Sequence, residues 1–121
     1  MISMLLVLAS LAGACGVVLA AAAAHVAPAS GLDSAAYLLL FHAVAVLGAA
    51  GLTDRGLLWR PMALVAMAGF VVGSGLFAGD IAMRAFAKRL FPMVAPAGGT
   101  LLILAWLVLA VAAIVAVGRT R

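Results

Sequence analysis

The chain has 121 residues, of which 69% are hydrophobic and only 8% are charged. Soluble domains are near half apolar and a quarter charged, so this chain lacks the polar residues to cover a water-soluble fold. Its formal charge is +4, but the basic residues fall between or after apolar runs, without interleaved aromatic residues. That pattern excludes nucleic acid as a partner and predicts an integral membrane protein whose main partner is the lipid bilayer.

Four apolar stretches are long enough to be membrane helices, which need about 20 mostly apolar residues. They run from about 2 to 26, 34 to 52, 61 to 79 and 98 to 118. No Lys or Arg precedes the first stretch, and it is longer than the core of a signal peptide, so we interpret it as a retained helix. The sequence therefore predicts an all-α bundle of four transmembrane helices, a single integral membrane domain spanning residues 1–121.

The residues between the stretches fit these boundaries. Asp33 and Ser34 are suitable N-cap residues for the second helix, and Pro61 suits the first turn of the third. Pro92 and Pro96 interrupt the chain before the fourth. We expect the fourth helix to begin at Gly98, after the second of these prolines.

An amphipathic segment lies between the third and fourth stretches, at residues 80–91. Asp80, Arg84 and Lys88 recur every four residues, so they share one helical face. The segment either extends the third helix or turns to lie in the membrane interface. In both arrangements Arg84, Lys88 and Arg89 are candidate contacts for lipid headgroup phosphates.

Four spans place both termini and the second loop on one side of the membrane. That side holds Arg55, Arg60, Arg119 and Arg121, and the other side holds Arg84, Lys88 and Arg89. The excess of one positive charge favours cytoplasmic termini and a multi-pass protein of the cell (inner) membrane. Below, "outer" means the side of the first and third loops.

Small residues are spaced along the predicted helices as in membrane helix interfaces. Gly69 and Gly73 are four residues apart, as are Gly75 and Gly79. A rough stripe on the first helix consists of Ala9, Gly13, Gly16 and Ala20. This spacing favours packing within the bundle, with self-association or docking of a partner as the alternative. The lone Cys15 is interpreted as another small packing residue.

Ionisable residues inside a membrane are costly and therefore informative about function. His25 ends the first span, His42 lies about two turns into the second, and Asp80 closes the third. Trp106 lies about as far into the fourth span as His42 lies into the second. All four belong to the outer half. They form either a structural hydrogen-bonding cluster, a site for a metal, haem or proton, or a site for a quinone or lipid headgroup.

Four segments resemble the YgdD-like family of small four-span membrane proteins, a domain of unknown function numbered 423 that includes the vertebrate transmembrane protein 256. They are AAAAAHVA with His25, YLLLFHAVAVL with His42, GLFAGD ending at Asp80, and APAGGTLLILAW ending at Trp106. The resemblance implies a four-helix membrane bundle and no established activity. It places His25, His42, Pro96, Gly98, Gly99 and Trp106 on motif positions. Alanines replace the family's glycines before His25 and Trp106, which narrows any gap between the helices there.

Two functional hypotheses follow. The leading one is a structural or accessory protein, without enzyme chemistry or cofactor, that binds a larger membrane protein complex, a second copy of itself or lipid. The alternative is a membrane-embedded site for a proton, metal ion, haem or quinone-like ligand centred on His42, as in a small transporter or cofactor-binding protein. Its candidate residues are His25, His42, Asp80, Pro96, Gly98, Gly99 and Trp106. The amides of Gly98 and Gly99 are expected to be free at a helix start, where they would attract an anion.

Overall fold

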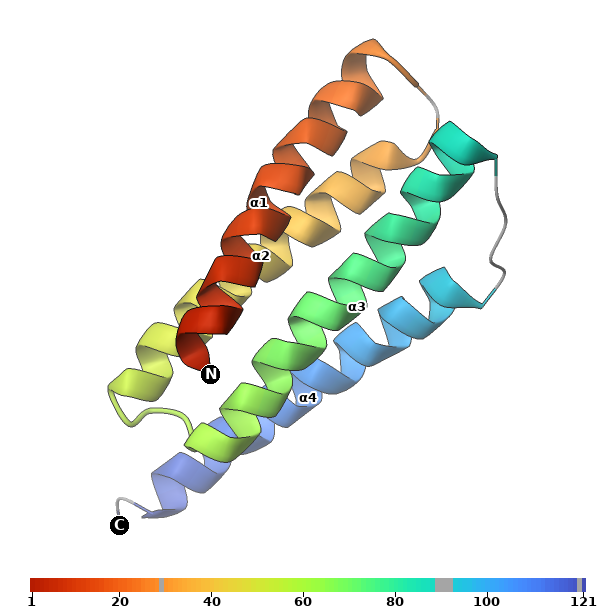
Figure 1. Ribbon diagram of the computed structural model, residues 1–121. Coiled ribbons are helices and arrows are strands. Elements are labelled where there is room, and N and C mark those ends of the chain that lie inside the picture. The colour runs from red at the N-terminus through yellow and green to blue at the C-terminus, as the bar shows by residue number, and fades with distance from the viewer. Residues whose placement is uncertain (29, 89–92, 120) are drawn as a thin grey trace.

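The computed structural model describes residues 1–28, 30–88, 93–119 and 121. In these residues the chain forms four α-helices: α1 (Ile2–His25), α2 (Leu32–Asp54), α3 (Arg60–Ala87) and α4 (Val94–Arg119) (Figure 1). Each helix is long and apolar enough to cross a membrane. The predicted all-α bundle of four membrane helices is therefore confirmed, and the chain is a multi-pass membrane protein with four candidate spans.

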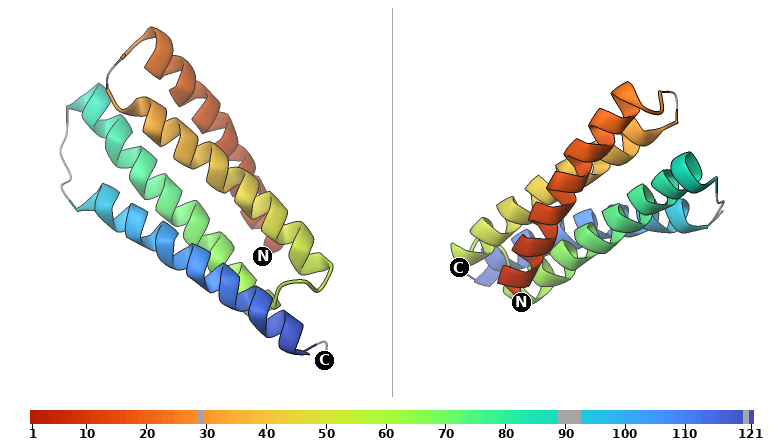
Figure 2. Two further views of the ribbon diagram at one scale, coloured as in Figure 1. Left: turned by 180° about the vertical axis from the view of Figure 1, so that it is seen from behind. Right: turned by 45° about the horizontal axis from the view of Figure 1, so that its top comes forward.

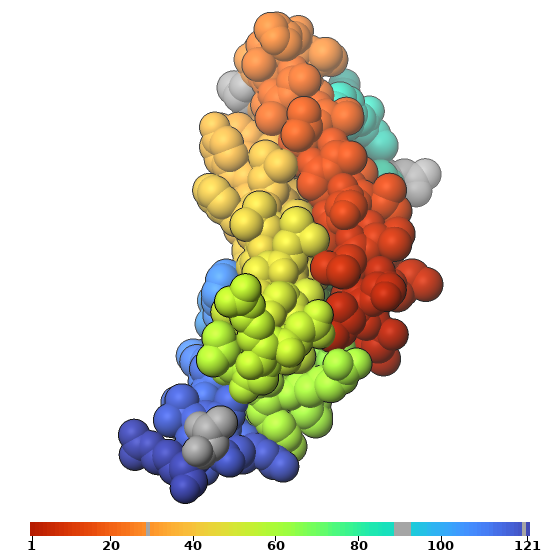
Figure 3. Space-filling view, turned by 90° about the vertical axis from the view of Figure 1, so that its left-hand side faces the viewer, coloured from red at the N-terminus to blue at the C-terminus, as the bar shows by residue number. Residues whose placement is uncertain are grey.

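The four helices pack in chain order. Helix α1 lies against α2, α2 against α3, and α3 against α4, whereas α1 meets α3 over a much smaller area. Both termini lie at one end, which we call the inner end, and the α1–α2 and α3–α4 connections lie at the outer end (Figure 1). The hairpins α1–α2 and α3–α4 diverge toward the outer end (Figure 2), and α1 runs along the edge of the molecule (Figure 3).

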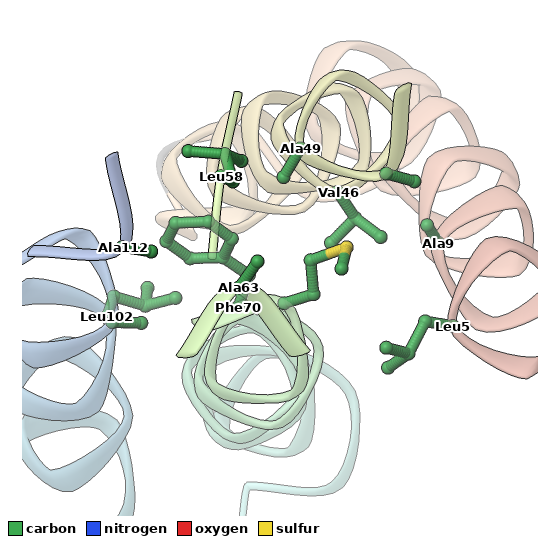
Figure 4. Close-up of a cluster of buried hydrophobic side chains, with 12 residues drawn as sticks. Leu5, Ala9, Val46, Ala49, Leu58, Ala63, Phe70, Leu102 and Ala112 are labelled. Carbon is green, nitrogen blue, oxygen red and sulfur yellow. The ribbon is translucent and has the colours of Figure 1, made fainter. Parts of the chain in front are cut away.

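The larger buried core lies in the inner half and is built mostly from small side chains. Six of its twelve buried residues are alanines: Ala9, Ala49, Ala50, Ala63, Ala105 and Ala112. Phe70 of α3 points into the space between the helices (Figure 4), and Met67 of the same helix is also fully buried in this core. Because lipid tails are as apolar as this core, the helices are held by close van der Waals contact and not by the hydrophobic effect. The inner half is thus packed mainly by apolar side chains.

Helix α2 begins two residues before the predicted start. Its N-cap is Gly31, whose φ of 80° lies in the left-handed region that glycine adopts without strain. The prediction that Asp33 or Ser34 caps this helix is therefore wrong. Asp33 instead lies in the first turn, where its carboxylate accepts a hydrogen bond from the Ser34 amide at 2.9 Å. A carboxylate in that turn also interacts favourably with the positive end of the helix dipole.

Helix α3 continues well past the predicted span. Pro61 lies in its first turn, as predicted, and the helix runs without a break to Ala87. Residues 80–87 therefore extend the third helix and do not turn into the interface. Lys88 ends the helix with a φ of 52°, so it leaves the helical face that Asp80 and Arg84 share. Arg89, the third candidate headgroup contact, lies outside the described residues.

Helix α4 begins at Val94, four residues before the predicted start. Pro96 lies within its first turn, where the missing proline N–H costs no helical hydrogen bond. The Pro96 carbonyl accepts a hydrogen bond from Thr100 Oγ1 at 2.9 Å. Gly98 and Gly99 consequently lie inside the helix, and the prediction of free amides there for an anion is wrong.

The two glycine pairs of α3 have different surroundings. A Cβ added to Gly69 would lie 2.8 Å from Ala105 Cβ, and one added to Gly73 would lie 2.9 Å from the Leu102 side chain. These glycines therefore let α4 approach α3 closely. A Cβ added to Gly75 or Gly79 would meet nothing within 4 Å. The first pair packs inside the bundle, whereas the second lies on an open face.

The small-residue stripe of α1 packs inside the bundle, against α2. Ala9 and Gly16 are buried, and a Cβ added to Gly16 would lie 2.8 Å from Leu40 Cγ. Cys15, however, is exposed on α1, so its interpretation as a buried packing residue is wrong. Because α1 contacts mainly α2, only a narrow side of this helix is covered. Cys15, which directly precedes the buried Gly16, therefore already faces outward.

Candidate functional site

His42 of α2 and Trp106 of α4 are in contact, with His42 buried and Trp106 48% exposed. The Trp106 indole Nε1–H donates a hydrogen bond to His42 Nε2 at 3.2 Å, although the residues are 64 positions apart in the chain. His42 is 6% exposed, and its Nδ1 lies 2.7 Å from the Leu38 carbonyl oxygen one turn earlier in α2. The sequence places the two residues at similar depths in their spans but leaves open whether they meet; the structure brings them into contact.

These contacts fit one tautomer of the imidazole. The Leu38 carbonyl only accepts, so His42 Nδ1 carries the hydrogen, and the indole only donates, so Nε2 offers its lone pair. Both ring nitrogens are then hydrogen-bonded. Haem iron or another metal needs a free nitrogen lone pair, so ligation by His42 requires the Trp106 bond to break.

Phe70 completes the cluster, which joins three helices. Its ring centroid lies 5.4 Å from that of His42 and 4.7 Å from that of Trp106, with tilted planes in both pairs. Such tilted aromatic pairs are favourable beyond their buried area. We call His42, Phe70 and Trp106 the aromatic cluster. Phe70 is not recognisable as a member of this cluster from the sequence, because an aromatic residue in an apolar run has no distinguishing local signal.

The other candidate residues do not join this cluster. His25 is exposed at the last turn of α1, whereas His42 lies ten residues into α2, roughly 15 Å further along the bundle axis. Gly98 is buried against α3, where an added Cβ would lie 2.7 Å from the Gly73 carbonyl oxygen and 2.8 Å from the Phe77 amide nitrogen. Pro96 is exposed, and Gly99 has open space around it. The predicted single site therefore separates: His25, Pro96, Gly98 and Gly99 lie toward the outer end, whereas His42 and Trp106 lie near the middle of α2 and α4.

Asp80 forms a second polar centre on α3. Its residue is 2% exposed, and its Oδ2 accepts a hydrogen bond from Arg84 Nη2 at 2.7 Å. The Arg84 side chain is 40% exposed, so it extends from the buried carboxylate toward the surface. Asp80 lies two turns beyond Gly73 on the same helical face, and Gly73 packs against the first turns of α4.

One oxygen of Asp80 has no partner. The hydroxyls of Ser10, Thr53, Ser74 and Thr100 all donate to the carbonyl four residues earlier, which satisfies them within their own helices. Asp80 Oδ1 is different: it is buried and accepts no hydrogen bond, alone in this respect in the part of the chain that the structure describes. A buried acceptor without a donor is costly, and the described side chains supply no donor for this oxygen.

Two apolar grooves flank α3 near Asp80. The larger, of about 580 Å³, lies between α1 and α3, and its walls include Leu11, Cys15 and Ala78. The smaller, of about 290 Å³, lies beside the start of α4 and is lined by Asp80 among apolar residues. Gly75 and Gly79 line both grooves. The two grooves are thus separated by the bare backbone of α3 at these glycines.

Comparison with known proteins relates the chain to a family. Its residues 12–99 match the family described as "Protein of unknown function (DUF423)". The match includes His25, His42 and Asp80 but ends before Trp106. Searches of curated proteins and of solved structures give no match. Since the match covers well over half of the sequence, this small four-span membrane protein belongs to the DUF423 family.

Proposed function

We propose that this protein is a non-enzymatic accessory protein of the cell (inner) membrane that binds another membrane component on the outer half of α3. The observation that carries the proposal is the contrast between the two glycine pairs. Gly69 and Gly73 are covered by α4, whereas Gly75 and Gly79 face open space. Exposed glycines at this spacing allow a helix or an acyl chain to approach the backbone closely.

The aromatic cluster supports a structural role for the intramembrane histidine. His42 uses both ring nitrogens in hydrogen bonds, one within α2 and one to α4. The remaining ionisable candidates, His25 and Asp80, belong to different parts of the outer half. This separation favours an accessory protein over one that performs chemistry at a shared centre.

Purification of the full-length protein in a mild detergent, followed by native mass spectrometry, tests the proposal. We expect the wild-type protein to retain lipid or a protein partner, and Gly79→Leu to lose it because the new side chain fills the open face. Gly48→Leu is the matched control, because Gly48 is also an exposed helical glycine with nothing within 4 Å of an added Cβ. A strictly monomeric wild-type particle without bound lipid or protein would refute the proposal.

A further inference from the structure

We propose that the component bound on α3 is an aminophospholipid, with its acyl chains in the two grooves and its ammonium group at Asp80. This inference rests on the proposed function, because it identifies the ligand of the same open face. Two independent observations support it: the shape of the grooves on either side of Gly75 and Gly79, and the unpartnered oxygen of Asp80.

The grooves have the form that a two-chain lipid requires. They run along both sides of α3 and are separated by the backbone at Gly75 and Gly79, which lines each of them. A transmembrane helix is about 10 Å wide and packs across such a glycine face without entering the grooves beside it. A diacyl lipid instead places one acyl chain in each groove. Its glycerol group then crosses α3 at Gly75 and Gly79.

The length of the larger groove matches one leaflet. Its walls run from Leu8 to Leu19 on α1 and from Val71 to Ala82 on α3. At a rise of about 1.5 Å per residue, each wall is roughly 16 Å long. The hydrocarbon core of a bilayer is about 30 Å thick, so the groove spans about half of it. This is the depth that the acyl chains of a single outer-leaflet lipid occupy.

Asp80 lies at the depth of the lipid headgroup. Helix α3 has 28 residues and is therefore about 42 Å long, which exceeds the hydrocarbon thickness by roughly 12 Å. If Arg60 marks the inner boundary of the core, the outer boundary falls near Asp80, and Arg84 lies one turn beyond it. The headgroup of a lipid in the grooves then meets the carboxylate first and the guanidinium next.

The charges at this depth complement a zwitterionic headgroup. The primary ammonium of an aminophospholipid donates the hydrogen bond that Asp80 Oδ1 lacks, and its charge matches the buried carboxylate. The phosphate of the same headgroup is placed toward the part-exposed Arg84 side chain. The Asp80 side chain is covered, so this contact requires its carboxylate to rotate toward the smaller groove, which the residue lines.

Nanodiscs containing equal amounts of phosphatidylethanolamine, phosphatidylcholine and phosphatidylglycerol provide the test. The trimethylammonium of phosphatidylcholine has no hydrogen to donate, and phosphatidylglycerol has no cation. We expect native mass spectrometry of the released wild-type protein to show preferential retention of phosphatidylethanolamine. Asp80→Asn should reduce that preference at least about fivefold, the loss typical of one charge-assisted hydrogen bond. Asp33→Asn, at an exposed carboxylate of the first turn of α2, should leave the preference unchanged.

Equal retention of the three lipids, or an unchanged preference in Asp80→Asn, would overturn the inference. If Asp80→Asn fails to fold, Gly79→Leu provides the decision, because it leaves Asp80 in place and fills the grooves. Gly79→Leu should lose phosphatidylethanolamine while Gly48→Leu keeps it, and equal retention by both variants overturns the inference. If a second copy or another protein occupies the face instead, the lipid assignment fails and the proposed function stands. If neither lipid nor protein binds, both fail.

Discussion

A polar side chain within the hydrocarbon core must satisfy its hydrogen-bonding groups inside the protein. His42 does so with two partners, the Leu38 carbonyl in its own helix and the Trp106 indole of α4. The first bond orients the ring and fixes the tautomer, and the second uses the remaining lone pair. The pair also joins α2 to α4, whose backbones are separated by α3. A residue type often associated with proton transfer or metal binding therefore acts here as a link between helices.

Trp106→Phe isolates this link. The substitution keeps an aromatic ring next to Phe70 but removes the only donor to His42 Nε2 in the described residues. We expect a loss of about 1 kcal/mol in the free energy of unfolding, the scale of interhelical hydrogen bonds in membranes. Unfolding of the purified protein by sodium dodecyl sulfate in mixed micelles measures this change.

Trp59→Phe is the matched control for that measurement. Trp59 lies at the inner end, where its ring contacts the Arg119 guanidinium at 5.7 Å, a contact that a phenyl ring largely keeps. Its substitution should change stability by less than that of Trp106. A double substitution with His42→Leu adds a second check. If the Trp106→Phe loss persists in the His42→Leu background, the two side chains are not coupled.

At the scale of the helix, the face on which a glycine lies decides whether it packs against a neighbouring helix or stays exposed. Gly98 and Gly99 are consecutive in α4, yet one is buried against the α3 backbone and the other has open space. The glycines of α3 show the same contrast between Gly73 and Gly75. Close backbone approach is what holds α3 to α4, because neither helix gains from burying apolar surface in lipid.

Gly98→Ala should therefore destabilise the protein strongly. The added methyl group would lie 2.7 Å from the Gly73 carbonyl oxygen and 2.8 Å from the Phe77 amide nitrogen, and backbone atoms cannot move aside cheaply. We expect a loss of about 2–3 kcal/mol, in the range of overpacked interiors. Gly99→Ala, one residue further along, should be neutral or slightly stabilising. Thermal unfolding in detergent compares the two, and equal effects would show that this contact does not hold α3 against α4.

Much of the architecture follows from the sequence, because lipid imposes simple rules on element length. The four helices are recognisable from apolar stretches of spanning length, whereas the similar depths of His42 and Trp106 leave open whether their side chains meet. The sequence does not show which face of each helix turns toward the other helices. Each helix is apolar all the way round, so periodicity does not show that Phe70 turns inward or that Cys15 turns outward. The start of α4 was missed because a proline in a first turn resembles one that ends a helix.

At the scale of the whole molecule, an even number of spans places both termini at the same end (Figure 1). The basic residues favour cytoplasmic termini by a narrow margin. Cysteine labelling of intact cells tests this orientation in a Cys15→Ala background. Asp33→Cys, in the first turn of α2, should react with a membrane-impermeant maleimide from outside. Asp54→Cys, at the last residue of α2, should react only after permeabilisation.

The opposite pattern would reverse the orientation and leave the four spans intact. Labelling of both positions from the same side would contradict the crossing of α2 itself. A cysteine in place of Ser10, near the middle of α1, serves as the control, because it should resist the reagent on both sides of the membrane. Its reaction would indicate that water reaches the middle of the bundle.

The packing of each helix against its predecessor in the chain has a consequence for how the protein is made. When α2 is synthesised, its packing partner α1 already exists. The same holds for α3, which packs against α2, and for α4, which packs against α3. Each described helix thus has a packing partner next to it in the chain. The backbones of α1 and α4 are not in contact. Assembly can therefore proceed while the ribosome is still translating, with the Trp106 bond to His42 as the step that joins the final span to an earlier hairpin.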